Sequence, residues 1–384
     1  MPASRPHPVY DRDYLVVNGA NAFYSLHATM FIFLPAYLYT LRLPPGTIGL
    51  LMATGTLSSV LAKPLNGWLV NRGRHGLYMA LGALLSTLAV LPWLLVREAG
   101  PALFPLRALQ GVAWSFFGTA AYGYVAAAAP PARRGEALGV FGLSFFVPTA
   151  LGGQAGEWIV RSGGFREMFL WAMAAALPAA LLPLLVRRRP VGDAIALSGL
   201  SEFLSPGNLV PNTAGFLFGA AYGTIFTFLP VYLLVRDGGT LAHFVLVYSG
   251  AVIATRTLGR KLADRLPRVW VSPAALLLLA GGILAIPLTR GNAGLTLVGV
   301  ASGLGHGFLF PSLSALAIDR AGEGREGMAM ALYTGSFDMG TVAGSGLLGF
   351  VAERFGYGTM FSAAALLTAA GAAFFFTPAG RDRR

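Results

Sequence analysis

Long apolar stretches alternate with short polar or charged stretches along almost the whole chain. A helix that crosses a lipid bilayer needs about 20 mostly apolar residues, and twelve stretches reach that length. The pattern therefore predicts twelve membrane-spanning helices, six in each half of the chain. They are expected roughly at 14–40, 47–70, 76–96, 101–127, 137–160, 165–186, 209–235, 241–263, 269–289, 293–318, 326–351 and 356–377.

The second half of the chain repeats the first. The hexapeptide FLPAYL at 33–38 returns as FLPVYL at 228–233, about 190 residues later. Three further matches, beginning at Lys63, Arg133 and Gly164, return in the same order at nearly the same offset. Four collinear matches are not a coincidence, so the sequence indicates one unit written twice.

The repeat fixes the predicted architecture. Six spans return each half to its starting side, so the halves are expected to be parallel repeats about an axis along the membrane normal. The fold class predicted is an all-α membrane protein with twelve transmembrane helices as two six-helix repeats. We expect an N-terminal bundle over 1–190, a short linker over 191–208 and a C-terminal bundle over 209–384. Pro35 and Pro230 lie in matching spans and are expected to kink them.

Composition supports a lipid environment. Charged residues make up 11% of the chain and hydrophobic residues 55%, whereas soluble domains carry about 25% charged residues. The mean hydropathy is +0.64. The net charge of +12 comes from short basic clusters between apolar stretches, which is typical of membrane topology signals and not of nucleic-acid binding. The absence of cysteine excludes disulfides and thiolate metal sites.

The distribution of Lys and Arg predicts an orientation. Most of the 28 basic residues fall on one side if both termini face the cytoplasm, which is the arrangement favoured by the positive-inside rule. The first span lacks a small-residue cleavage site and is interpreted as an uncleaved helix. The expected location is a bacterial inner membrane, with both termini cytoplasmic and the lipid bilayer as a partner.

Several motifs resemble those of the major facilitator superfamily. The segment 67–74 resembles the family's loop 2–3 signature, and 259–265 resembles a second copy of it. Residues 107–111 resemble the fourth-helix motif. Pro148 with the glycines at 152, 153 and 156 resembles the fifth-helix motif of proton-coupled exporters. The resemblance covers essentially the whole chain.

The resemblance implies a secondary transporter that works by alternating access, most simply by proton-coupled efflux of a small organic solute or drug. It implies a small-molecule substrate and protons as partners, and we expect a monomer. The alternative is an importer or facilitator of a sugar, organic acid or siderophore-like solute. Two features depart from the family pattern. Asn71 replaces an acidic residue that Asp264 keeps, and the fifth-helix motif has one extra residue before its glycine pair.

One acidic residue, Asp338, lies near the middle of a predicted span. A charge at the bilayer centre costs about 2.5–3.5 kcal/mol on insertion scales, so such residues are usually functional. Asp338 is the first candidate for proton coupling or for binding a cationic substrate group. The resemblance adds Arg107, an arginine tied to proton movement or substrate binding. The structural alternative makes Asp338 a partner of Arg107 or Arg256.

Other polar residues are candidates for a substrate pocket or for a cytoplasmic gate. Helical periodicity places three pocket candidates, Asn21, Tyr24 and His27, within one arc of their helix. For each, the alternative is a satisfied interior polar group. The pocket candidates are Asn21, Tyr24, His27, Gln110, Trp114, Tyr222 and His306. The gate candidates are Gly67, Asn71, Arg72, Arg74, Asp264, Arg265, Lys63 and Arg256.

Catalytic motifs do not emerge from the sequence. The glycine run at 303–307 lacks the preceding strand and the lysine of a nucleotide-binding loop. No zinc pair or nucleophile elbow is present. We therefore expect no enzyme activity, no cofactor and no metal. The glycine pairs Gly152–Gly156 and Gly340–Gly344 have a spacing that lets helices approach closely, either for movement or for static packing.

Overall fold

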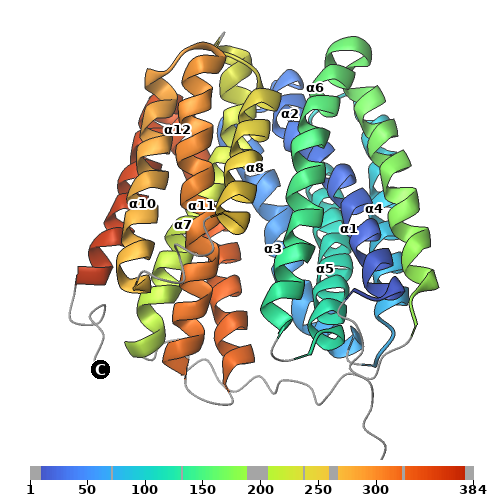
Figure 1. The fold of residues 1–384 in the computed structure, drawn as a ribbon. Coiled ribbons are helices and arrows are strands. Elements are labelled where there is room, and N and C mark those ends of the chain that lie inside the picture. Colours follow the sequence, from blue (N-terminus) through green and yellow to red (C-terminus); the bar gives the residue numbers. More distant parts are fainter. Residues whose placement is uncertain are drawn as a thin grey trace, which may run out of the picture.

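A computed structural model of the chain describes residues 10–70, 72–130, 133–187, 206–236, 238–258, 267–321 and 325–376. Within these ranges the regular structure is entirely helical. Figure 1 shows the helices running side by side, with α1 to α6 on one side and α7 to α12 on the other. The linker lies almost wholly outside the described residues, so the bundle boundaries stay a prediction.

The first half contains six helical arms, as the hydropathy pattern predicts. Its longest helix, α6, bends at Gly164, where φ is +77° and a side chain would be strained, so it supplies two arms. The elements are α1 (Arg12–Met30), the 3₁₀ turn η1 (Phe31–Phe33), α2 (Leu34–Thr40), α3 (Pro45–Val70), α4 (His75–Val90), η2 (Leu91–Leu94), α5 (Leu103–Ala128), α6 (Arg134–Leu181) and η4 (Leu182–Leu185).

The second half repeats this arrangement. Its longest helix, α12, bends at Gly356 (φ +85°), the repeat partner of Gly164. The elements are α7 (Pro206–Val235), α8 (Leu241–Thr257), α10 (Arg268–Ala285), η5 (Ile286–Leu288), α11 (Gly291–Ala321), α12 (Glu326–Ala373) and η6 (Phe374–Phe376). The predicted all-α fold with twelve spans in two repeats is confirmed.

Seven helices of the described chain are long and apolar enough to cross a membrane. Two of them, α6 and α12, are bent and provide two arms each. The helix α8, with 17 residues, is too short for this set, and α1 and α5 also fall outside it. They carry polar interior residues such as His27 and Arg107, which lower their hydropathy. Helices of this kind are stable in a bilayer because neighbouring helices shield their polar side chains.

The two matched prolines act differently. Pro35 follows the 3₁₀ turn η1, which interrupts the first span between α1 and α2. A kink at this point stays a prediction. The helix α7 continues through Pro230 to Val235. A proline inside a helix removes one backbone hydrogen bond without necessarily ending the helix, because neighbouring helices can shield the free carbonyl.

The paired glycines pack helices tightly within each half. A Cβ atom at Gly340 would lie 1.8 Å from the carbonyl oxygen of Phe216 in α7, and one at Gly344 would lie 2.1 Å from that of Ala220. In the first half, a Cβ at Gly156 would lie 2.7 Å from the Phe33 ring. The predicted close approach is therefore confirmed. It joins α12 to α7 and α6 to the first span, which matches the static-packing alternative.

Candidate functional site

An ion pair joins the two halves of the chain. Nζ of Lys63 in α3 donates a hydrogen bond to Oδ2 of Asp338 in α12. The Lys63 side chain is 41% exposed and that of Asp338 is 22% exposed, so solvent reaches the pair. The partner of Asp338 in the described chain is thus Lys63, and neither Arg107 nor Arg256 fills that role. Lys63, a gate candidate from the sequence, therefore makes a contact between the two halves.

Arg107 lies near the start of α5 and packs against α3. Its Nη1 donates to Oε1 of Gln110 at 2.9 Å. A Cβ at Gly55 would lie 2.6 Å from Nη2, so the glycine leaves room for the guanidinium group. The Nε atom is buried and has no hydrogen-bond partner among the described residues. Arg107 and Gln110 therefore form one polar pair, as expected from their spacing on one helix face.

Trp114 continues the same face of α5. Its ring lies 5.4 Å from that of Tyr24 and 6.4 Å from that of Phe145, measured between centroids. The residue is 39% exposed. One turn further along the helix, a Cβ at Gly118 would meet open space, and Tyr122 is 56% exposed. This face of α5 is therefore accessible from Trp114 to Tyr122.

The three candidates in α1 are buried and have partners inside the first half. The amide of Asn21 donates to Ser144 Oγ at 2.8 Å. The Tyr24 hydroxyl pairs with Ser86 Oγ at 2.6 Å, and Nδ1 of His27 lies 2.9 Å from the carbonyl oxygen of Ala172. These contacts are those of satisfied interior groups. A pocket role for these three residues stays a prediction.

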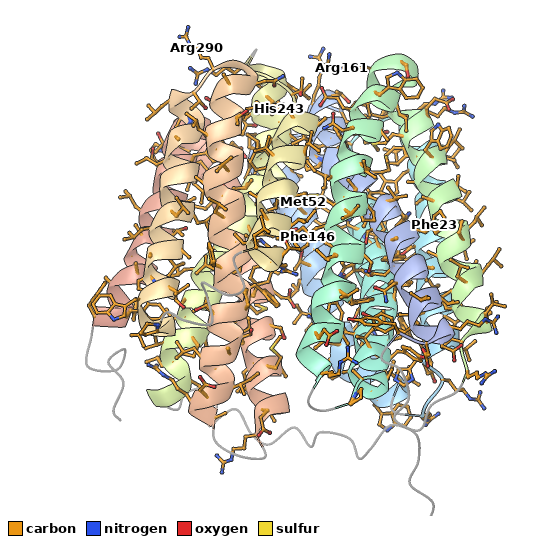
Figure 2. The ribbon with its side chains drawn as sticks, viewed as in Figure 1. Phe23, Met52, Phe146, Arg161, His243 and Arg290 are labelled. Atoms are coloured by element: carbon orange, nitrogen blue, oxygen red, sulfur yellow. The ribbon has the colours of Figure 1, made fainter. Side chains whose placement is uncertain are left out.

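Aromatic rings surround His306 where the halves meet. Its Nδ1 bonds to the Tyr248 hydroxyl, and the centroids of Phe146, Phe218 and Tyr222 lie 5.7, 5.0 and 5.8 Å from its ring. Phe146 belongs to α6 of the first half. Figure 2 places it near mid-height of the bundle, between the two groups of helices. We call these five residues the aromatic cluster. Tyr222 and His306 are therefore brought together, whereas the α1 candidates lie elsewhere.

Arg256, predicted as a gate residue, points into the bundle. Its guanidinium carbon lies 4.7 Å from the centroid of the Phe146 ring. A Cβ at Gly142 would lie 2.6 Å from its Nη1. The side chain is half-buried and its Nε has no partner among the described residues. Lys63 and Arg256 are repeat partners in sequence, yet they make different contacts.

The other gate candidates lie in the last turn of α3, at the turn between α3 and α4, or outside the described chain. The guanidinium of Arg72 covers the Trp68 ring at 4.0 Å. Gly67 faces open space, and Gly73 adopts φ +75° in the turn. Arg74 is exposed and directly precedes α4. Asn71, Asp264 and Arg265 lie outside the described residues.

The repeated arginine motif begins with Arg133, just before α6. Its guanidinium donates two hydrogen bonds to Glu136, at 2.9 and 2.8 Å. The Tyr10 hydroxyl also donates to Glu136, and this hydrogen bond raises the pKa of Tyr10. These groups lie at helix ends outside the spans. The motif therefore ties the start of α6 to the segment before α1.

The halves are closed at one end of the bundle. We call it the upper end; Arg161 and Arg290 mark it in Figure 2. The amide N–H of Gly46 in α3 donates to Oε2 of Glu353 at 3.0 Å. Oε2 of Glu157 in α6 accepts the amide N–H of Ala242 in α8 at 2.7 Å. These hydrogen bonds between a carboxylate and a backbone amide close the α3–α12 and α6–α8 interfaces at the upper end. We call these two interfaces the α3–α12 seam and the α6–α8 seam.

Sequence reasoning missed most of the α3–α12 seam. A Cβ at Gly49 would lie 2.2 Å from the carbonyl oxygen of Ser345, and one at Gly349 would lie 2.7 Å from that of Pro45. These glycines follow no paired spacing that singles them out. Their role appears only when the two halves are placed together.

We predict that Gly49→Val holds the upper end open. The added side chain cannot occupy space next to the Ser345 carbonyl, so α3 and α12 must separate there. The chain contains no cysteine, so Ser345→Cys provides a single buried reporter. A membrane-impermeant maleimide should react with it faster in the Gly49→Val background. Gly250→Val, at a position facing open space, should leave the rate unchanged. Equal rates in all backgrounds would contradict the closed seam.

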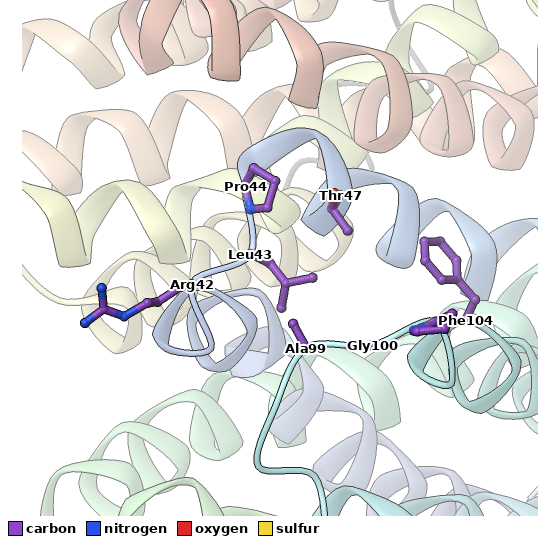
Figure 3. Close-up of a pocket in the computed structure, with 8 residues that line it drawn as sticks. Arg42, Leu43, Pro44, Thr47, Ala99, Gly100 and Phe104 are labelled. Atoms are coloured by element: carbon purple, nitrogen blue, oxygen red, sulfur yellow. The ribbon is translucent and has the colours of Figure 1, made fainter.

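A cavity of about 390 Å³ lies at the upper end, in the first half (Figure 3). It is formed by the turn between α2 and α3 and by the start of α5. None of the predicted transport residues lines it. Its lining residues are Arg42, Leu43, Pro44, Thr47, Ala99, Gly100, Pro101 and Phe104. The candidate site is therefore the interior region that contains the Lys63–Asp338 pair, Arg256 and the aromatic cluster.

Comparisons with known proteins identify relatives along the whole chain. An uncharacterized MFS-type transporter of Pseudomonas aeruginosa (strain UCBPP-PA14) is 28% identical over 180 residues, which cover 46% of this chain and 44% of that relative. The chain thus matches less than half the length of that relative. The staphylopine export protein of Staphylococcus aureus (strain Mu50 / ATCC 700699) is 21% identical over 356 residues, covering 88% of this chain and 89% of the relative.

A solved structure shares the fold. The crystal structure of a bacterial homolog of the human lysosomal transporter Spinster, inward-facing and unoccupied, superposes with a TM-score of 0.75 at 14% identity. The match covers 97% of each chain. The sequence model of the Major Facilitator Superfamily matches residues 17–290 and 236–384. With twelve helical arms in two repeats, the chain belongs to the Major Facilitator Superfamily, a family of integral membrane transporters.

Proposed function

We propose that this protein is a proton-coupled secondary transporter that exports a small organic solute across a bacterial inner membrane. It would do so by alternating access, with the repeats over 1–190 and 209–384 moving as two bodies. The observation that carries the proposal is the ion pair between Lys63 and Asp338. It connects the two halves, and it contains Asp338, a carboxylate near the middle of the first arm of α12.

Protonation of this pair would couple a proton to movement. A proton on Asp338 removes the negative charge, so the attraction to Lys63 across the α3–α12 seam is lost. The link between the halves then weakens on one side of the membrane. Loss of the proton restores the ion pair and, with it, this link between α3 and α12. A proton gradient would bias this cycle because the two sides offer different proton concentrations to Asp338.

Direction and orientation rest on the sequence and on a relative. The staphylopine export protein, which aligns over most of this chain, is an exporter by name. The fifth-helix motif around Pro148 resembles that of proton-coupled exporters. The bias of Lys and Arg in the sequence supports an orientation with both termini in the cytoplasm. The end opposite to the upper end would then face the cytoplasm.

Transport in everted membrane vesicles tests the proposal. A pH gradient is imposed and a panel of solutes is added one at a time, while proton flux and solute uptake are followed together. The proposal expects proton flux that appears only with a transported solute. Solute movement that ignores the pH gradient would instead indicate a facilitator. Gradient-driven movement in the opposite direction would indicate an importer.

A further inference from the structure

Three cations lie between the helices in the middle part of the described chain, and one of them has a carboxylate partner. Lys63, Arg107 and Arg256 are the cations placed between the helices, and Asp338 is the carboxylate placed among them. Because Asp338 pairs with Lys63, both arginines lack a carboxylate partner in the described residues. A charge inside the membrane is costly, so such residues usually have a charged partner or mark a functional site. The positive charges of Arg107 and Arg256 are therefore not balanced by a carboxylate among the described residues.

Of the two, Arg256 lies where a transported molecule would pass. Arg107 is held by Gln110 and packs against Gly55, both in the first half. Arg256 comes from α8 of the second half and reaches Phe146 of the first half. Substrate sites of such two-repeat transporters lie near the midplane, at the interface between the repeats.

The surroundings of Arg256 offer rings and hydroxyls but no counter-charge. The titratable groups that interact electrostatically with it come from four helices: Tyr122 from α5, Tyr248 from α8, His306 from α11 and Tyr333 from α12. None is a carboxylate. The buried Tyr333 hydroxyl and the Nε of Arg256 have no hydrogen-bond partners in the described part of the chain. Buried donors of this kind are usually satisfied, so the region lacks an acceptor.

The guanidinium group is also accessible. Arg256 is half-buried, and Tyr122 on the opposite half is 56% exposed although it interacts with Arg256. Both the first half, at Tyr122, and the second half, at Arg256, therefore have accessible surface in this region. The aromatic cluster begins at Phe146, whose ring Arg256 contacts. An apolar or aromatic body could pack there while an acidic group meets the arginine.

We propose that Arg256 binds the acidic group of the transported molecule, and that the substrate is an organic anion with an aromatic or apolar body. A planar guanidinium recognises a carboxylate through charge-assisted, often bidentate hydrogen bonds. The buried Tyr333 hydroxyl, which interacts electrostatically with Arg256, is a further unpaired donor among the described residues. This inference rests on the proposed transport function and specifies its substrate class.

Equilibrium binding to the purified protein tests the charge preference. Isothermal titration calorimetry is run without any gradient, using 1-naphthoate, neutral 1-naphthamide and cationic 1-naphthylmethylammonium, which share one aromatic body. We expect naphthoate to bind roughly 10- to 100-fold more tightly than naphthamide, the range of a hydrogen bond to a charged group. Equal affinities, tighter binding of the cation, or no binding of naphthoate would overturn the proposal.

Variants then assign the preference to one residue. Arg256→Gln should reduce naphthoate affinity to that of naphthamide and leave naphthamide binding unchanged. Arg256→Lys should retain the preference. Arg290→Gln, which removes an exposed arginine at the upper end, should behave like the parent protein. Equal loss of both ligands in Arg256→Gln would show a merely structural role and overturn the assignment. If that variant fails to fold, the ligand series on the parent protein still decides the charge preference.

This test is independent of proton coupling. Binding is measured at one pH with no gradient, so a failure of the Asp338 mechanism would leave the charge preference intact. Conversely, proton-driven transport of a neutral solute, with no preference for naphthoate, would contradict the substrate class and leave the proposed transport function standing.

Discussion

Replacing Asp338 by asparagine will abolish pH-driven transport while the protein still reaches the membrane in folded form. The amide has nearly the same shape and can accept a hydrogen bond from Lys63, so the packing of α3 on α12 should survive. The asparagine amide cannot take up and release a proton as a carboxylate does, so the link between the halves no longer responds to pH. We expect loss of at least 90% of gradient-driven flux, or about tenfold, which corresponds to roughly 1.4 kcal/mol in the coupling step.

The measurement is gradient-driven flux in everted vesicles, normalised to the amount of folded protein. Glu98→Gln is the matched control, because Glu98 is an exposed carboxylate in the loop before α5. This variant should transport as the parent protein does. Unchanged gradient-driven flux in Asp338→Asn would remove Asp338 from the coupling mechanism.

Adding a single methyl group at Gly340 will destabilise the second half. The Cβ of Gly340→Ala would lie 1.8 Å from the carbonyl oxygen of Phe216, which is backbone and cannot rotate away. The helices α7 and α12 must move apart, and the neighbouring contact of Gly344 with Ala220 is lost with them. Overpacking of this kind costs about 1–3 kcal/mol or more.

Thermal unfolding of the purified protein in detergent measures this effect. Gly335→Ala is the control on the same helix, because a Cβ there meets open space. It should leave the melting temperature unchanged or raise it, since alanine favours a helix over glycine by about 1 kcal/mol. If both variants melt at the same temperature, the close α7–α12 packing is wrong.

The fold could be predicted from hydropathy and from the repeat. Apolar stretches of spanning length and the recurrence of the 33–38 segment at 228–233 were sufficient for twelve helices in two sets. The sequence did not reveal that two pairs of spans are joined by a bend. At Gly164 and Gly356 a single glycine with positive φ turns the chain, so α6 and α12 need no separate loop. Such a turn resembles an ordinary polar boundary in a hydropathy pattern.

The candidate site was only partly predictable, because its contacts join distant parts of the chain. The position of Asp338 in the middle of a span was readable from its apolar neighbours. Its partner was not, because Lys63 lies 275 residues away and meets it only when the two halves pack. Arg256 shows the same limit. Its repeat partner Lys63 pairs with an acid, whereas Arg256 faces Phe146, and equivalent positions gave no reason to expect different contacts.

The central claim is that protonation of Asp338 loosens the link between α3 and α12. The most direct measurement is the distance between spin labels attached at Leu65→Cys and Ala331→Cys, two exposed positions within about two helical turns of Lys63 and Asp338 on these helices. The cysteine-free chain allows both labels to be placed without further changes. We predict that the distance lengthens from alkaline to acidic pH, and that Asp338→Asn makes it independent of pH. A distance that ignores pH in the parent protein, or that responds equally in Asp338→Asn, would contradict the claim.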